Sequence, residues 1–121
     1  MTAFNLPAAD APAEEWGRLA VSLPGWRWMP GMLTDCGERV TDPEICYLGT
    51  LPDPDDPATE GCMVRLLART CWIHRAAVLP LGAVVSIETP DGLSVTGRGS
   101  TLGRAAIAAA AAIGEWPEGE G

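Results

Sequence analysis

The strongest indications of the fold lie between residues 83 and 113, in the sequence AVVSIETPDGLSVTGRGSTLGRAAIAAAAAI. Its first part, 83–89, alternates between apolar and polar residues and is rich in β-branched side chains, which is typical of a strand. The sequence PDG at 90–92 is a turn, and 93–97 returns as a second strand. These residues predict an antiparallel hairpin.

A helix is predicted directly after this hairpin, over 101–113, with Ser100 as its N-cap and Gly114 at its end. A helix that is apolar nearly all round is usually buried on more than one side. Because one small domain has limited material to cover both sides, we expect a symmetric homodimer through this helix. The expected contact is a flat strip of alanines, formed by Ala105, Ala106, Ala109 and Ala110.

Two further helices are predicted closer to the N-terminus. The first runs over 11–22 behind Asp10 as N-cap, and the second runs over 57–69 behind Asp56 as N-cap. Gly61 lies inside the second helix and lowers its stability, so we expect it to permit close packing.

Short strands are expected between and after these helices. They cover a segment around 26–28, a hairpin of 32–35 with 38–41, a strand at 45–48 and a strand at 72–78. The order of elements predicts an α+β fold, a small antiparallel sheet with about three helices packed on it. We expect one domain over 1–121, with flexible ends at 1–9 and 115–121.

Composition limits the kinds of partner. The formal net charge is −8 at pH 7, and all eight basic residues are arginines. Nucleic-acid backbones attract clusters of Lys and Arg, so we expect no direct nucleic-acid binding. The acidic balance either keeps the protein in solution or attracts a basic partner protein.

The start of the sequence and the longest apolar run bear on localisation. The first fifteen residues contain no basic residue and no apolar segment of the kind found in secretory signals. The run 105–113 is too short to span a bilayer. We therefore expect a cytoplasmic protein without membrane contact.

The cysteines and the single histidine give no pattern typical of a metal site or a catalytic site. Cys36, Cys46, Cys62 and Cys71 form no C-x-x-C pair, and we expect free thiols, no metal and no cofactor. His74 lies three residues after Cys71, on the opposite face if the segment is a strand. No nucleophile motif accompanies it, so we expect a partly buried structural histidine and no enzyme.

The segment GRGST at 97–101 joins a strand to a helix and is the first candidate binding site. Free N–H groups at a helix N-terminus can hold an anion, and arginines can add charge-assisted hydrogen bonds. The alternative is a simple turn with an N-cap. The candidate ligand-binding residues are Arg98, Gly99, Ser100, Thr101 and Arg104.

A second candidate site is an exposed ridge for a partner protein, since Trp and Arg are enriched at interaction hot spots. It comprises Trp26, Arg27 and Trp28, with the acidic loop residues Asp53, Asp55 and Asp56. The alternatives are that both tryptophans fill a core with Trp16, Leu19 and Leu23, and that the carboxylates favourably meet a helix N-terminus.

Three blocks of the sequence resemble small accessory proteins of tailed phages and prophages. They are PGWRWMPGM at 24–32, LPDPDDPATEGC at 51–62, and the C-terminal strand with its alanine-rich helix. The last block is also similar to the end of the phage helix/sheet/helix sandwich domain. The resemblance implies a phage accessory protein that acts in a host bacterial cytosol, and it supplies no catalytic residues.

We therefore expect a non-enzymatic protein that acts by binding, as an inhibitor of a host protein. The alternative is a small-ligand binder that sequesters an anionic nucleotide.

Overall fold

Three helices and one antiparallel sheet make up the fold in the computed structural model, which describes residues 6–42 and 49–117. The elements are α1 (Ala13–Ser22), α2 (Pro57–Ala68), β1 (Trp72–Leu79), β2 (Gly82–Glu88), β3 (Ser94–Gly99) and α3 (Leu102–Ile113). The strands lie in the order β1-β2-β3, and both neighbouring pairs are antiparallel. The α+β fold predicted from the sequence is confirmed.

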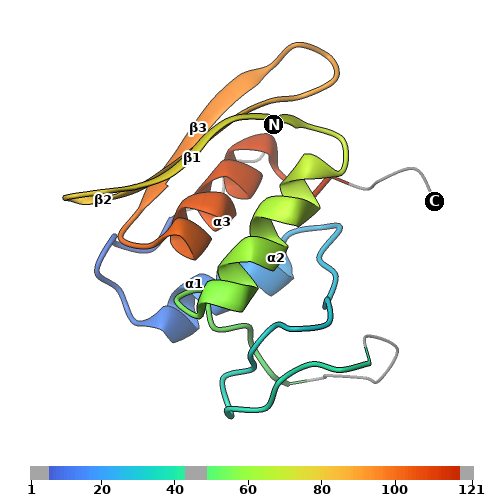
Figure 1. The fold of residues 1–121 in the computed structure, drawn as a ribbon, viewed down its shortest axis with the longest axis vertical. Helices are drawn as coiled ribbons and strands as arrows, with labels where there is room; N and C mark the ends of the chain where they lie inside the picture. Colours follow the sequence, from blue (N-terminus) through green and yellow to red (C-terminus); the bar gives the residue numbers. More distant parts are fainter. Residues whose placement is uncertain (1–5, 43–48, 118–121) are drawn as a thin grey trace.

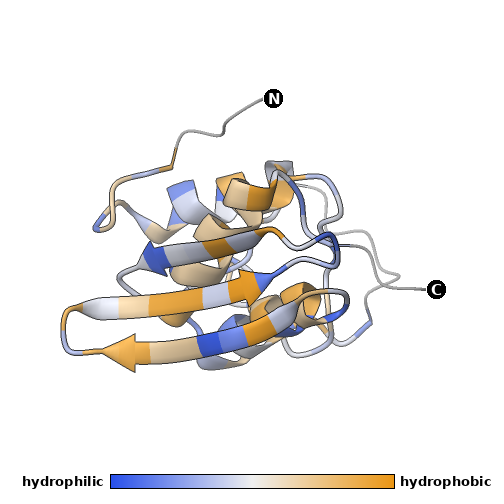
Figure 2. Cartoon of the chain, turned by 90° about the horizontal axis from the view of Figure 1, so that it is seen from above, coloured by the Kyte–Doolittle hydropathy of each residue, from blue (hydrophilic) through white to orange (hydrophobic). Residues whose placement is uncertain are grey.

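The sheet and the helices form two layers (Figure 1). The sheet lies on one side of the molecule, and α3 packs against it, mainly below β3 and β2, while α2 packs on α3 and α1 lies further from the sheet. Figure 2 looks onto the face of the sheet that no helix covers, which we call the open face. None of the helices within 6–42 and 49–117 is long and apolar enough to cross a membrane.

Helix α3 is the centre of the core. Each of its residues from 103 to 111 is buried by the sheet and helices of its own chain. β3 approaches the helix so closely that a Cβ added at Gly97 would lie 2.2 Å from the carbonyl oxygen of Ala105. The alanine strip therefore makes the close contact predicted for it, but with the same chain. The reason for expecting a dimer through this helix is removed.

Tryptophans fill the space between α1, α3 and the C-terminal segment. Trp16 and Trp116 are 1% and 0% exposed, and Trp26 and Trp28 pack against the core from its margin. The Trp116 indole N–H donates to the carbonyl oxygen of Ala20 at 2.9 Å. The prediction of a flexible segment from residue 115 is therefore wrong for its first part, because Trp116 is anchored in the core.

Helix boundaries agree with the sequence except at the caps. Asp56 caps α2 as predicted, since its side chain accepts from the backbone N–H of Thr59. At α3 the N-cap is Thr101 rather than Ser100, because β3 extends to residue 99. At α1 the N-cap position is Pro12 and no side chain caps it, so Asp10 does not have the predicted role.

The segment between α1 and α2 contains less regular structure than predicted. Residues 26–28 form no strand, and the expected hairpin is reduced to the isolated bridge Leu33–Arg39 with a few neighbouring backbone hydrogen bonds. The strand expected at 45–48 lies outside the described residues. Gly61 permits no close packing, since no atom lies within 4 Å of a Cβ added there.

Candidate functional site

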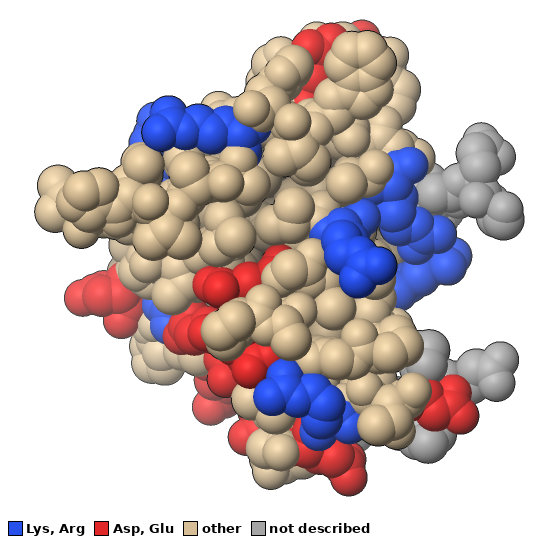
Figure 3. All heavy atoms as spheres, viewed as in Figure 1, with Lys and Arg blue, Asp and Glu red and all other residues tan. Residues whose placement is uncertain are grey.

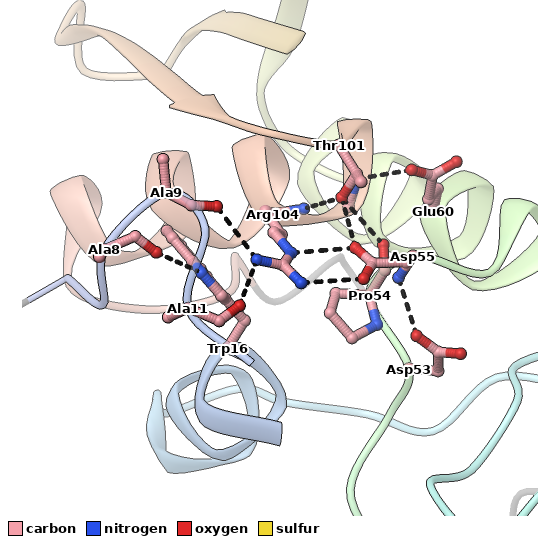
Figure 4. Close-up of polar contacts among 11 residues, drawn as sticks. Ala8, Ala9, Ala11, Trp16, Asp53, Pro54, Asp55, Glu60, Thr101 and Arg104 are labelled. Carbon is pink, nitrogen blue, oxygen red and sulfur yellow. Dashed lines mark hydrogen bonds and ion pairs between the residues drawn. The ribbon is translucent and has the colours of Figure 1, made fainter. Parts of the chain in front are cut away.

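Arg104, a predicted ligand-binding residue, is buried and fully engaged inside the protein (Figure 4). Its Nε and Nη2 donate to the two carboxylate oxygens of Asp55 at 3.0 and 2.9 Å. Its Nη1 donates to the carbonyl oxygens of Ala9 and Ala11 at 3.0 and 2.6 Å. The guanidinium thus ties the segment before α1 and the loop before α2 to the start of α3.

Polar groups at the start of α3 are likewise hydrogen-bonded to other residues of the chain. The Thr101 hydroxyl donates to Asp55 at 2.8 Å and accepts from the Arg104 backbone N–H at 3.3 Å. The Gly103 N–H donates to the Glu60 carboxylate at 3.2 Å. Carboxylates of the chain itself therefore occupy the place predicted for an anionic ligand, and this prediction is corrected for Thr101 and Arg104.

Arg98, Gly99 and Ser100 remain at the surface, where they line an open pocket of about 300 Å³ with Leu79, Leu81 and Ala83. Most of this lining is apolar or backbone. With Arg104 turned inward, Arg98 is the one cation among the residues lining the pocket. The pocket therefore lacks the paired arginines on which the nucleotide hypothesis depended.

The acidic loop also has a structural role. Asp55 binds Arg104, and Asp56 binds Arg39 at 2.7 Å while it caps α2. Asp53 accepts from the Asp55 backbone N–H at 3.0 Å. These contacts support the alternative that the carboxylates interact favourably with a helix N-terminus. They also leave the loop little freedom to bind a partner.

Acid should weaken this network. Burial raises the pKa of Asp55, but hydrogen bonds from Arg104 and Thr101 and the Arg104 charge outweigh it, so the pKa lies below 3.8. A carboxyl whose folded-state pKa is depressed stabilises the protein above its unfolded-state pKa, and this contribution is lost as the pH falls. We expect the urea midpoint to fall as the pH drops through 3.8 toward the folded-state pKa. In Asp55→Asn the fall should be smaller, and an equal fall would contradict this role.

The predicted Trp-Arg-Trp ridge is only partly exposed. Trp26 and Trp28 are half-buried and meet edge to face, with ring centroids 5.5 Å apart, and Trp26 also meets Trp116 at 5.6 Å. Arg27 is exposed between them. The two tryptophans belong to the margin of the core, which agrees with the core reading of the sequence.

The cysteines and His74 form no site among the described residues. Cys62 and Cys71 are buried, Cys36 is exposed, and all three are free thiols, while Cys46 lies outside the described residues. Burial raises the pKa of both buried thiols. No group of three His, Cys, Asp or Glu residues within 6–42 and 49–117 could hold a metal. His74 is exposed rather than partly buried, and its Nε2 lies 3.1 Å from Glu88.

The largest exposed apolar side chains gather at a place that the sequence did not single out. Trp72 and Val78 of β1 are each 74% exposed, and Leu81 in the following turn is 102% exposed. We call residues 72–81 the β1 edge. Within the part of the chain that the structure describes, β2 is the single strand that pairs with β1, so one side of β1 is unpaired.

Exposed apolar residues on an unpaired strand are unusual, because proteins commonly protect such edges from association. β1 has partial protection in a bulge between Ile73 and Arg75 and in the Arg75 charge. From Arg75 to Leu79 the register to β2 is regular. The strand itself was predicted, but its exposure depends on which face each side chain occupies and on how far α2 and α3 extend below the sheet, which the sequence does not encode locally.

No protein-family model, curated protein or solved structure matches the chain.

Proposed function

We propose that this chain acts by binding another protein through the β1 edge, with the partner supplying an extended segment that pairs with β1. The observation that carries the proposal is the exposure of Trp72, Val78 and Leu81 along an unpaired strand. In strand addition, main-chain hydrogen bonds supply affinity and alternate side chains supply specificity. Trp72 and Arg75 belong to the residue types enriched at binding hot spots.

The resemblance of the sequence blocks to phage accessory proteins supports a host protein as the partner and inhibition as the result. The nucleotide-sequestering alternative has less support, because Arg104 and Thr101 bind Asp55 instead. Covering an edge strand requires a contact surface and no chemical step, so the proposal is for a non-enzymatic protein.

Site-specific crosslinking in bacterial cells tests the proposal. A photoreactive amino acid placed at Leu81 or Val78 should give a discrete adduct with a second protein, identified by mass spectrometry. The same amino acid at Ala112, which is exposed on α3, is the matched control and should give no such adduct. Equal adducts at Ala112 and Leu81, or none at either β1-edge position, would contradict the proposal.

The binding energy should depend on the apolar residues of the edge. Changing Trp72 to Ala should reduce formation of the Leu81 adduct at least about tenfold, since a hot-spot tryptophan contributes about 2 kcal/mol or more. Thermal unfolding should be almost unchanged, because the side chain is 74% exposed. A loss of adduct that accompanies unfolding would show a structural role instead.

A further inference from the structure

The strand register defines which side chains share the open face with the β1 edge. Arg75 pairs with Ser86, and Ser86 pairs with Thr96, so these three residues form one row across the sheet. The hydroxyls of Ser86 and Thr96 lie 3.0 Å apart, in agreement with this register. In the next row on the same face, Ala77 pairs with Val84 and Val84 with Arg98.

The three strands contain two arginines and one carboxylate, which reverses the charge balance of the whole chain. The chain has 16 acidic and 8 basic residues, yet neither β1 nor β3 contains an Asp or Glu. β2 contributes one carboxylate, Glu88, which pairs with Trp72 across the sheet and lies 3.1 Å from His74 Nε2. Arg75 and Arg98 are exposed there, and no described residue forms a salt bridge with either.

The acidic side chains lie mainly elsewhere. Figure 3 shows many of them in the lower half of the molecule, where basic groups also lie, and some at the top, while further basic groups lie at the upper left and on the right. On the strands the arginines outnumber the carboxylates, so a strand that approached β1 would meet a small excess of positive charge on an otherwise negative protein. Local charge of this kind selects among partners by complementarity.

We propose that the segment bound at the β1 edge is acidic, an extended stretch in which carboxylates alternate with apolar side chains. This inference rests on the proposed function and specifies the chemistry of the partner. A strand added beside β1 lies about 4.8 Å from it, so one carboxylate of the segment reaches Arg75 directly. The apolar side chains of the segment cover Val78 on the other face, and Trp72 and Leu81 close its two ends.

Arg98 acts at longer range. It lies two strands from Arg75, on β3, and a strand added at β1 remains too far away for a direct ion pair. Its charge attracts the acidic segment through the field over the open face, an effect that salt screens. The two arginines are therefore expected to differ in how strongly they affect binding and in how that effect responds to salt.

Short synthetic peptides and the full chain test the inference by fluorescence anisotropy. The first peptide alternates glutamate and valine, the second alternates lysine and valine, and the third is the glutamate peptide with every second backbone nitrogen methylated. We expect the second and third to bind at least about tenfold more weakly than the first, through lost charge complementarity and lost main-chain hydrogen bonds.

Variants of the protein then locate the contact. Arg75→Glu should weaken binding of the glutamate peptide at least about tenfold, and Arg98→Glu should weaken it less, with the difference from wild type shrinking at high salt. Arg65→Glu, a change at an exposed arginine on α2, is the matched control and should have little effect. Equal binding by wild type and Arg75→Glu would overturn the inference.

The other outcomes of these experiments separate the inference about acidity from the proposed function. If the lysine peptide binds as well as the glutamate peptide, or if the glutamate peptide does not bind, the inference about acidity is wrong. The proposed function would still stand if the Leu81 crosslink to a partner forms. If sedimentation instead shows a wild-type dimer that Leu81→Glu dissociates, the edge is occupied by a second copy and the acidic segment is excluded.

Discussion

Replacing Trp16 by Ala should lower the free energy of unfolding by about 3–5 kcal/mol, the range for truncating a large aromatic side chain in a core. Trp16 is 1% exposed, and its indole N–H donates to the carbonyl oxygen of Ala8 at 3.1 Å. The loss is a large part of the total stability of a domain this size, which is about 5–15 kcal/mol. Urea unfolding followed by circular dichroism measures it.

Two other tryptophan changes show where the loss comes from. Trp16→Phe retains most of the apolar volume and removes the hydrogen bond, so it should cost about 1 kcal/mol for that bond plus a smaller packing loss. Trp72→Ala removes an equally large side chain that is 74% exposed, and should change stability by less than about 0.5 kcal/mol. Similar losses in Trp16→Ala and Trp72→Ala would contradict the described core.

Replacing Arg104 by Ala should destabilise the fold by about 3 kcal/mol, near the lower end of the range for breaking a buried ion pair. The lower end applies because Asp55 keeps 35% of its side-chain surface in solvent, where water can hydrate its charge. The carbonyl oxygens of Ala9 and Ala11 also lose their donor. This result would reverse the expectation from sequence that Arg104 serves a ligand.

Matched variants separate the roles of Arg104. Arg98→Ala, at an exposed arginine six residues earlier, should change stability by less than about 0.5 kcal/mol. Arg104→Lys keeps the charge but loses the planar fork that meets both oxygens of Asp55, so it should fall between wild type and Arg104→Ala. A double-mutant cycle of Arg104→Ala with Asp55→Ala should show coupling of about 1 kcal/mol or more. Additive effects would mean that the two side chains act independently.

Local sequence signals determined most of the secondary structure. The turn at 90–92, the cap and proline at Asp56 and Pro57, and the left-handed glycine at Gly114 each act on residues within one turn of themselves. The corresponding hairpin and helices were therefore predictable to within one or two residues. The alanine-rich composition likewise determined that α3 would be buried.

The long-range contacts between these elements, by contrast, depend on the tertiary structure. Arg104 meets Asp55 across 49 positions of sequence, and Trp116 meets Ala20 across 96. Nothing near Arg104 in the chain distinguishes a buried structural arginine from one that faces a ligand, so the pattern around Ser100 indicated an anion site. The tail after Gly114 appeared polar and mobile because its anchor lies on a distant helix.

The exposure of the β1 edge has the same origin. β1 has the composition of an ordinary half-buried strand, and its register to β2 follows from the short turn between them. On the helix side of the sheet its side chains are covered only where α2 and α3 reach them, and α3 packs mainly below β3 and β2 because Gly97 and the alanine strip let them approach closely. Sequence signals thus predicted a small antiparallel sheet with about three helices packed on it, and the lateral position of α3, set by packing between distant residues, left Val78 uncovered on the helix side of the sheet. Trp72 is exposed for another reason, because its pairing with Glu88 places it on the open face, together with Arg75 and Ser86.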